Sequence, residues 1–565
     1  MISQIEQKYL NTDILIIGGG AAGCMAAITA KDTAPDYQII IMEKAQIERS
    51  GCLAAGINAI NAYLNPGESP ETFLDYVKKE AYGIIQDHLV LSMAREINEM
   101  AERLEDWGLP IEKDEQGKYK ARGKRSIRIK GERIKPIIAA QVKKRNIKVL
   151  NRVVATDYLT YNGRVVGAVG FSIRENKFYV IQAKVVICAT AGAAGIYSSN
   201  NPGFAPHRTW YPPFNTGAGL AMGLRAGAEM TSFEMRFVAL RIKDTLAPTG
   251  TVAQGTKISQ INGLGEKYLE KYQQLTTAER LKAGLLENEE GRGPCFFDTT
   301  QLSSEESNGL KEAYLHMSPT MILSWANREI EPNEAPLELT CSEPYLVGGH
   351  AMAGYWINGK RQTTLPGLYA VGEAAGGVPK KYVTGSMAEG KIAAIAAIAE
   401  IRALADTADD EISAALVKKL FEQTYNPLQY YNSQGFGCTP EELEEALQKV
   451  MDEYAGGIRE NYKITEAKLI IASEKIAYLE DLVQSLMAKN LHQLMMCHEV
   501  RDRILIAKVL VEHLKYRKET RWPGYQERLD YPEQSSQWKK FINSSYSSEA
   551  NPPIKMIERD IKGDF

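Results

Sequence analysis

Cysteine is sparse in this chain, and its spacing excludes several kinds of site. No Cys-x-x-Cys pair occurs, and the seven cysteines are spread along 565 residues: Cys24, Cys52, Cys188, Cys295, Cys341, Cys438 and Cys497. A disulfide framework, a zinc site or an iron–sulfur cluster needs cysteines at closer and more regular spacing. We therefore expect a reduced protein whose own residues bind no metal.

Long apolar runs and an excess of one charge are also missing. The apolar run Ile392–Ala399 is too short to span a bilayer. Residues 1–20 lack the basic region and apolar core of a secretory signal. The formal net charge of −3 argues against nucleic acid or an anionic membrane as a general partner. We expect a cytoplasmic protein in which any basic site is local.

What is present is a chain long enough for two to four domains, with changing patterns along it. Residues 13–43 read as strand, helix and strand, and residues 148–192 as short strands with a hairpin turn at Tyr161–Arg164. From about Glu441 the apolar residues follow helical spacing. The final 45 residues are polar and aromatic, which indicates an extended tail over the surface.

A glycine pattern at the first strand predicts a dinucleotide site. Gly18-x-Gly20-x-x-Gly23 follows an apolar strand and opens a helix, and Glu43 ends the next strand. The first glycine permits a tight turn, the second lets the backbone approach a pyrophosphate, and the third allows close helix–strand packing. The helix N-terminus then faces the phosphates, and the glutamate accepts hydrogen bonds from a ribose.

Two later stretches favour FAD over NAD. "TTLPGLYAVGEAAGG" at 363–377 resembles the second FAD-contacting strand of flavoproteins with two dinucleotide folds, in which an acid, here Glu373, meets the ribitol. "VVICATAGAAG" at 185–195 resembles the strand that closes the first half of such a domain. Each stretch alone could be a buried parallel strand, but their order along the chain favours the flavin interpretation.

Four stretches extend this resemblance over the whole chain. They are "ERSGCLAAGINAIN" at 48–61, the segment 208–244 that begins "RTWYPPFNTGAG", "KKYVTGSMAEG" at 380–390, and "KETRWPGYQERLDYP" at 518–532. The chain resembles the succinate dehydrogenase/fumarate reductase flavoprotein superfamily and, within it, the alpha subunits of dissimilatory adenylylsulfate (APS) reductases.

The resemblance implies an α/β fold with a discontinuous, Rossmann-like FAD domain. Residues 1–237 would form its first part and residues 345–430 its second part. An α+β capping domain would be inserted at 238–344, and a helical domain with a tail would follow at 431–565.

The resemblance also implies an activity, namely reduction of APS to sulfite and AMP through a flavin N5–sulfite adduct, in a reversible reaction. Because this chain has no cluster motif, a separate ferredoxin-like iron–sulfur beta subunit would supply the electrons. Two alternatives stay open. One is a fumarate reductase or a paralogue that reduces another small anion, and the other is an electron-relay or scaffold subunit.

The residues that the resemblance assigns to catalysis are Asn61, Glu132, Trp210, Arg241, His350, Lys380 and Lys381. Cations suit this chemistry because charge-assisted hydrogen bonds strengthen where water is scarce. Each residue also has an ordinary interpretation: a core position for Trp210 and His350, an ion pair for Arg241 and Glu132, and a solvated loop for the lysine pair.

The residues assigned to the cofactor are Gly18, Gly20, Ala21, Ala22, Glu43, Lys44, Ser50, Gly51, Asn58, Val154, Ala189, Thr190, Gly192, Gly372, Glu373, Gly385 and Ser386. In the membrane-bound relatives a histidine joined to the flavin follows an Arg-Ser pair. Here Gly51 follows Arg49 and Ser50, so we expect non-covalent FAD.

Two positions depart from the APS reductase pattern. Lys380 stands where that branch has a histidine, and a lysine releases its proton far less readily than a histidine near neutral pH. The segment "KDTLAPTGT" at 243–251 lacks the glycine and aromatic residues of the branch. The sequence therefore predicts an anion site at Lys380 or Lys381 and leaves the identity of the anion open.

Overall fold

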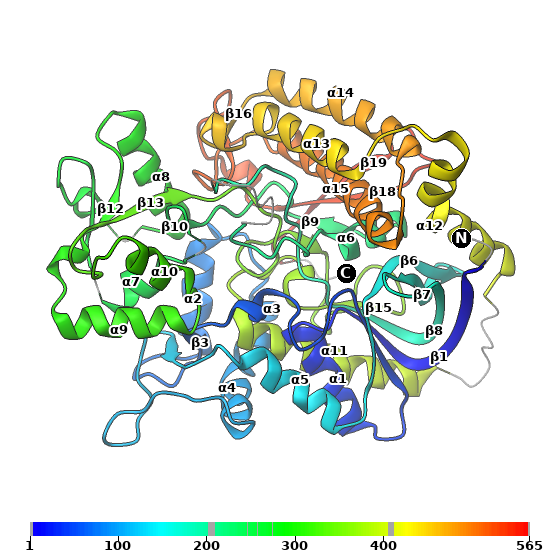
Figure 1. The fold of residues 1–565 in the computed structure, drawn as a ribbon, viewed down its shortest axis with the longest axis horizontal. Coiled ribbons are helices and arrows are strands. Elements are labelled where there is room, and N and C mark those ends of the chain that lie inside the picture. The colour runs from blue at the N-terminus through cyan, green and yellow to red at the C-terminus, as the bar shows by residue number, and fades with distance from the viewer. Residues whose placement is uncertain are drawn as a thin grey trace.

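A mainly parallel sheet, built from distant parts of the chain, is the largest sheet and lies toward the right-hand side of Figure 1. The computed structural model describes residues 4–201, 209–245, 247–256, 258–273, 275–404 and 412–562. The strands of this sheet are β5 (Lys148–Asn151), β2 (Ile39–Glu43), β1 (Glu6–Ile17), β8 (Lys177–Cys188), β7 (Arg164–Ser172) and β6 (Val153–Tyr161), in that order, with β15 (Leu368–Ala370) also paired to β8.

The expected strand–helix–strand unit is confirmed. Strand β1 and strand β2 are parallel, with Ile17 opposite Met42, and helix α1 (Ala21–Thr33) connects them. The predicted hairpin joins β6 to β7 through Asn162 and Gly163, whose φ angles of 48° and 76° are those of a tight hairpin turn.

One edge of strand β8 pairs with two different strands, and this arrangement positions the site. Residues 178–182 pair antiparallel with β7, whereas residues 186–188 pair parallel with β15. The carboxyl ends of β1, β8 and β15 therefore lie side by side. The glycine turn after β1, Ala189 after β8 and Gly372 after β15 consequently meet at one edge of the sheet, where open α/β sheets bind ligands.

Helices cover this sheet and surround it. Helix α11 (Tyr382–Ala403) packs closely on α1, because a Cβ atom on Gly390 would lie 2.2 Å from the carbonyl oxygen of Ala22. The other helices of the first part are α2 (Pro70–Glu80), α3 (Asp87–Ala94), α4 (Ile97–Asp106), α5 (Ile134–Lys144) and α6 (Ala218–Arg225). A small antiparallel sheet pairs β3 (Ala59–Asn61) with β4 (Ser126–Arg128).

The middle of the chain forms a unit with its own hydrophobic core, which supports the proposed capping domain at 238–344. This core contains residues between Ile242 and Leu339 and is separate from the main core. The unit, green in Figure 1, contains α7 (Gly250–Gly255), α8 (Thr277–Glu289), α9 (Ser304–Leu315), α10 (Thr320–Asn327), β10 (Leu240–Ile242), β13 (Leu337–Cys341), β12 (Phe296–Phe297) and β11 (Gln260–Ile261).

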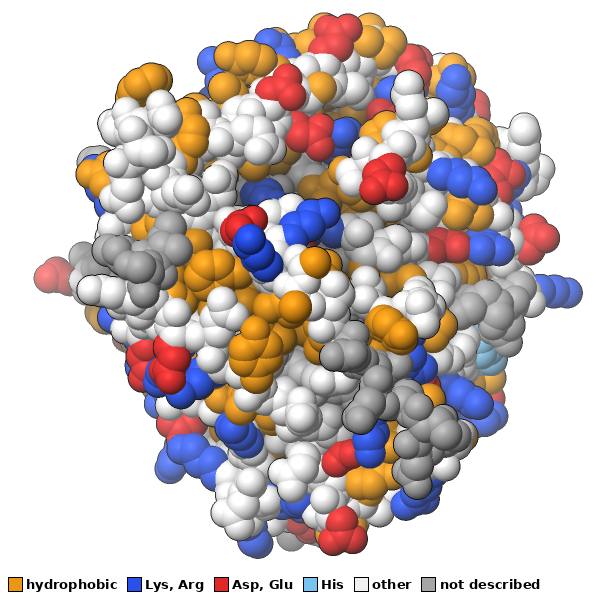
Figure 2. Space-filling model, turned by 90° about the vertical axis from the view of Figure 1, so that its right-hand side faces the viewer, with side chains coloured by type: hydrophobic (Ala, Val, Ile, Leu, Met, Phe, Trp, Pro, Cys, Tyr) orange, Lys and Arg blue, Asp and Glu red, His pale blue; other side chains and the backbone are white. Residues whose placement is uncertain are grey.

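Four long helices follow, as the apolar spacing predicts, although the first begins before Glu441. They are α12 (Ala414–Gln434), α13 (Pro440–Tyr454), α14 (Glu466–Leu482) and α15 (Leu491–Tyr516). Among the described residues no helix combines the length and apolar character needed to cross a membrane. Lysine, arginine and acidic side chains are mixed over the face shown in Figure 2, as the small net charge leads one to expect.

The expectation of an extended surface tail is wrong. Strand β18 (Phe541–Tyr546) pairs with β9 (Met230–Thr231) and β19 (Ile554–Arg559) in a sheet that includes β14 (Gly354–Tyr355), and β17 (Glu527–Arg528) pairs with β16 (Lys463–Ile464). Trp522 and Arg528 are fully buried. Some of the polar residues that indicated a surface position are instead buried, such as Arg528, which pairs with the exposed Asp530 at 2.8 Å.

Candidate active site

A cavity of about 1590 Å³ runs along the carboxyl edge of the largest sheet and reaches the capping unit. Most residues that the sequence predicts for the site line it: Gly18, Gly20, Ala21, Ala22, Glu43, Lys44, Ser50, Gly51, Asn58, Asn61, Val154, Ala189, Thr190, Trp210, His350, Gly372, Glu373 and Ser386. They come from both parts of the FAD domain, so only the folded chain brings them together.

The glycine turn has the geometry that a dinucleotide requires. Gly18 has a φ of +101°, and a Cβ atom there would lie 2.4 Å from the carbonyl oxygen of Ala189. Gly20 faces open space, whereas a Cβ atom on Gly23 would lie 1.9 Å from the carbonyl oxygen of Gly18. The turn therefore leaves room for a ligand at Gly20 and close packing on either side of it.

The N-terminus of α1 is available to an anion. Its cap residue is Gly20, which has no side chain to cap the first turn, and no acidic residue lies in that turn. Glu43 is buried beside this turn, where its carboxylate accepts hydrogen bonds from Gly19 N (2.8 Å) and Ser50 Oγ (3.0 Å). Free backbone N–H groups at a helix N-terminus suit a pyrophosphate, so these residues fit FAD.

Glu373, which follows β15, lies beside the phenol of Tyr211 and the imidazole of His350. Tyr211 donates a 2.5 Å hydrogen bond to Glu373 Oε2, and His350 Nδ1 lies 3.3 Å from Glu373 Oε1. Burial alone would raise the pKa of Glu373, but His350, Tyr211 and Lys381 together hold that pKa below its ordinary value of 4.5. The carboxylate is therefore ionised at neutral pH, inside the cavity wall.

Aromatic rings enclose His350. The Trp210 ring lies edge-on at 5.0 Å between ring centres, Phe237 at 4.8 Å and Tyr382 at 5.4 Å. Trp210 also donates from its backbone N–H to Tyr345 Oη at 3.1 Å. These rings cover most of the imidazole, which keeps 21% of its side chain exposed where it and Trp210 border the cavity.

Arg241 lies behind this wall in β10 and is fully buried. Its Nη2 is 3.8 Å from Glu343, and none of its guanidinium nitrogens has a hydrogen-bond partner among the described residues. Glu343 accepts a hydrogen bond from Tyr345, which links the arginine to Trp210. Arg241 does not border the cavity itself, so its part in the site stays a proposal.

The adjacent lysines are both buried and both paired with acids. Lys381 Nζ donates to the carbonyl oxygens of Gly372 (2.6 Å) and Ala375 (2.7 Å) and lies 3.1 Å from Glu389. Lys380 Nζ lies 2.9 Å from Glu80. Because both lysines are buried, the solvated-loop interpretation is wrong. Neither lysine borders the cavity, so direct contact with a substrate stays a proposal.

Three other predicted residues lie away from the cavity. Glu132 has 47% of its side chain exposed and pairs with His316 of the capping unit at 2.6 Å. Gly192 donates its N–H to Tyr211 Oη, and Gly385 packs beside Met93. Arg208, at the start of the predicted active-site stretch, and Leu246, in the divergent 243–251 segment, lie outside the described residues.

The sequence analysis missed several residues that border the cavity, among them Arg122, Tyr211 and Tyr382. Arg122 belongs to "RGKR" at 122–125, a run of basic residues with no acid in it. That run was the available signal for a second cationic position. The two tyrosines carry no local signal, because only the tertiary structure places them against Glu373 and His350.

Comparison with known proteins agrees with this geometry. The family model described as "FAD binding domain" matches residues 13–387. This chain is a member of that FAD-binding family. The alpha subunit of adenylylsulfate reductase from Megalodesulfovibrio gigas is 29% identical, over 95% of this chain and 93% of the relative. The solved adenylylsulfate reductase of Archaeoglobus fulgidus is 35% identical, with a TM-score of 0.94, over 100% of this chain and 98% of that one.

Fumarate reductases are more distant from this FAD-binding chain. A subunit of the CoM/CoB fumarate reductase of Methanothermobacter marburgensis is 24% identical, over 95% of this chain and 98% of the relative. The E. coli quinol fumarate reductase FrdA is 18% identical with a TM-score of 0.83, over 99% of this chain and 98% of that one, and shows the fold alone. The chain is thus an FAD-dependent oxidoreductase of the succinate dehydrogenase/fumarate reductase superfamily, and it resembles the APS reductases more than these fumarate reductases.

Proposed function

We propose that this protein reduces APS to sulfite and AMP, and catalyses the reverse reaction when sulfite and AMP are supplied. The observation that carries the proposal is the full-length likeness to an adenylylsulfate reductase, at 35% identity and a TM-score of 0.94, against 18% identity to a fumarate reductase of the same fold. The cavity supports it by placing Trp210 and His350 beside the residues that fit FAD.

The residues of this chain have separate tasks in the proposed reaction. The glycine turn, Glu43 and Glu373 would hold FAD, which supplies two electrons when bound. The bond between sulfur and the bridging oxygen breaks, and AMP leaves with that oxygen. Because two electrons enter a doubly anionic substrate, the products carry more negative charge than the substrate. A preorganised cation such as Arg241 stabilises that charge, more strongly where water is excluded.

His350 is suited to hold a proton beside the cavity. Its Nδ1 lies 3.3 Å from the ionised Glu373, although it makes no hydrogen bond among the described residues. Trp210, Phe237 and Tyr382 surround the ring, which keeps bulk water from that side of it. We propose that the imidazole donates a proton or a hydrogen bond to the leaving AMP.

We further propose that a separate iron–sulfur subunit delivers the electrons. The seven cysteines are far apart in the sequence, and the described residues contain no group of three or more His, Cys, Asp or Glu side chains arranged to hold a metal. Rapid reduction of the flavin by a co-purified iron–sulfur protein, compared with the rate in the isolated chain, would test this proposal.

Sulfite titration of the oxidised holoenzyme tests the proposed function. Sulfite should bleach the long-wavelength band of the flavin spectrum, and AMP added afterwards should allow electrons to pass to an acceptor dye. Sulfate, added at the same ionic strength, is the matched control and should leave the spectrum unchanged. An unchanged spectrum at high sulfite concentration would contradict the proposal.

A reductase of an unsaturated carboxylate is the second candidate. The 24% identity to a fumarate reductase polypeptide over nearly the full length favours it, as do the departures at Lys380 and residues 243–251. Fumarate added to the reduced protein separates the two functions. Rapid return of the oxidised flavin spectrum with fumarate, and none with APS, would favour the carboxylate reductase.

A further inference from the structure

A partly buried cation, Arg122, lines the cavity from the segment between α4 and β4. Its guanidinium makes one hydrogen bond among the described residues, from Nη1 to Asn58 Oδ1 at 2.7 Å. Its Nε is buried and has no partner in the described part of the chain. Because Arg122 makes only this one hydrogen bond among the described residues and lines the cavity, its positive charge is suited to an anionic ligand there.

Nothing described near Arg122 neutralises it. The groups that act on its charge are Tyr382, Arg128 and Tyr314, of which only Arg128 is charged, with the same sign. Burial lowers the pKa of Arg122 to about 10, so the side chain remains a cation at neutral pH. By contrast, Glu80 in the same cavity wall is paired with Lys380 at 2.9 Å.

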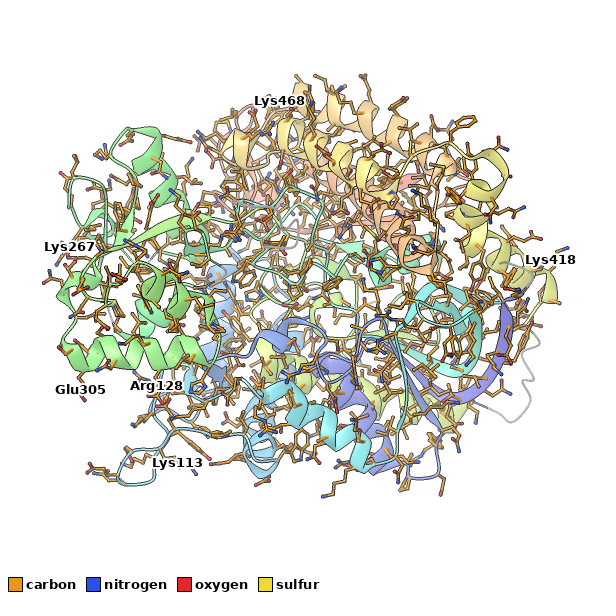
Figure 3. All side chains as sticks on the ribbon, in the orientation of Figure 1. Lys113, Arg128, Lys267, Glu305, Lys418 and Lys468 are labelled. Atoms are coloured by element: carbon orange, nitrogen blue, oxygen red, sulfur yellow. The ribbon has the colours of Figure 1, made fainter. Side chains whose placement is uncertain are left out.

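Arg122 belongs to the seam between the FAD domain and the capping unit. Asn58, which holds its Nη1, also donates from Nδ2 to Thr251 Oγ1 in α7 at 3.0 Å. Arg128, six residues further along, lies where the capping unit meets the first part of the chain in Figure 3. The contacts of Arg122 thus come from the 52–61 segment and the capping unit rather than from the Gly18–Gly23 turn.

We propose that Arg122 binds a second anionic group of the substrate, the phosphate of a nucleotide, while the charge of Arg241 acts on the opposite side of the aromatic wall. The inference rests on the proposed function in taking a nucleotide as the ligand. With Nη1 bonded to Asn58 Oδ1 and Nε inaccessible inside the protein, Nη2 is the guanidinium nitrogen left to donate a charge-assisted hydrogen bond to a phosphate.

The test compares Arg122→Gln and Arg122→Lys with the wild type and with Lys113→Met, all as oxidised holoenzymes. Lys113 lies on the same segment, pairs with Glu105 at 2.6 Å and projects from its outer end in Figure 3, so Lys113→Met removes a positive charge outside the cavity. Binding of AMP and of inorganic phosphate is measured by calorimetry, and sulfite affinity is measured from the flavin spectrum.

Arg122→Gln should weaken AMP binding by about tenfold to a hundredfold, the usual effect of losing one charge-assisted hydrogen bond. Arg122→Lys should weaken it less, and Lys113→Met should leave it unchanged. The sulfite affinity should stay within about threefold of the wild type, because Arg122 contacts the phosphate.

The two failures are distinguishable. If the wild type binds phosphate but neither AMP nor sulfite, and Arg122→Gln loses phosphate, the proposed function fails while the anion site stands. Equal AMP or phosphate affinity in Arg122→Gln and the wild type would overturn the inference, even where sulfite still bleaches the flavin. A wild type that binds neither AMP nor phosphate would also overturn it.

Discussion

The guanidinium of Arg241 lies inside the protein, 3.8 Å from Glu343, with no hydrogen-bond partner among the described residues. Arg236, five residues earlier, is equally buried but donates to Tyr525 O (3.0 Å), Ala455 O (2.7 Å) and other acceptors. The two arginines look alike in the sequence. Their surroundings give Arg236 a structural role, and we propose that the charge of Arg241 serves the reaction instead.

Replacement of Arg241 should therefore affect activity more than stability. We expect Arg241→Met to lower kcat/KM by about 10²–10³, the usual effect of removing one preorganised charge-stabilising group. Its thermal midpoint should fall less than that of Arg236→Met, because Glu343, 3.8 Å from the guanidinium, keeps its hydrogen bonds from Tyr345 Oη and Asn200 N. Arg236→Met is the matched control and should destabilise the fold by several degrees or more, since it strands buried carbonyl groups. Equal losses of stability in both variants would argue against a catalytic charge at Arg241.

At the scale of elements, three segments meet at Lys380. Its ammonium group lies 2.9 Å from Glu80 at the end of α2 and 3.2 Å from Thr277 Oγ1 in the first turn of α8. Thr277 also donates its hydroxyl to Glu80 at 2.6 Å. Because α8 belongs to the capping unit, this buried pair fixes the capping unit to the FAD domain beside the cavity.

Replacement of either Lys380 or Glu80 alone should lower the stability of the fold more than replacement of both. Lys380→Met leaves a buried carboxylate and should lower the free energy of unfolding by about 3–5 kcal/mol, whereas Lys380→Met with Glu80→Gln should recover part of that loss. Denaturant unfolding of the wild type, both single variants and the double variant measures the coupling. Strictly additive losses would show that the two side chains do not interact.

The same pair gives a pH dependence with a defined sign. Burial raises the pKa of Glu80, but Lys380 and Thr277 outweigh it and hold that pKa below 4.5. A carboxyl group with a depressed pKa stabilises the fold above its unfolded value and loses that contribution as pH falls through its folded value. The stability difference between the wild type and Glu80→Gln should therefore be full above about pH 5 and shrink on acidification.

At the scale of the whole molecule, the cavity depends on every unit of the chain. It lies at the carboxyl ends of β1, β8 and β15. Pro248 and Met317 of the capping unit line it. Lys44, which also lines it, pairs with Glu499 of α15 at 2.7 Å and so connects the cavity to the helical domain. The separate core of the capping unit supports the division at 238–344. The boundaries of all the proposed domains, those at 238–344 included, stay predictions.

FAD should be held in this cavity without a covalent bond. Gly51 borders the cavity next to Ser50 and offers no imidazole to the flavin ring. Acid precipitation of the purified holoenzyme should therefore leave intact FAD in the supernatant, identified by chromatography and mass. Flavin that remains with the precipitated protein would contradict the prediction. A histidine-linked flavoprotein of the superfamily, treated in the same way, is the control.

The amino-acid sequence by itself determined the nucleotide-binding end of the site. The glycine turn, the helix that follows it and the acid after β2 are fixed by backbone geometry within about thirty residues, so the local pattern was sufficient. The resemblance of the later strands then identified FAD and the superfamily, which the comparisons confirm.

Only the tertiary structure decided which charges face the cavity. Lys380 and Glu80 are three hundred residues apart in the chain, yet their contact at 2.9 Å means that this lysine is not an unpaired cation. Arg122, in a segment whose pattern gave only a short basic run, keeps its charge uncompensated. Burial makes each pairing decisive, because a charge taken out of water must find its partner in the fold or in a ligand.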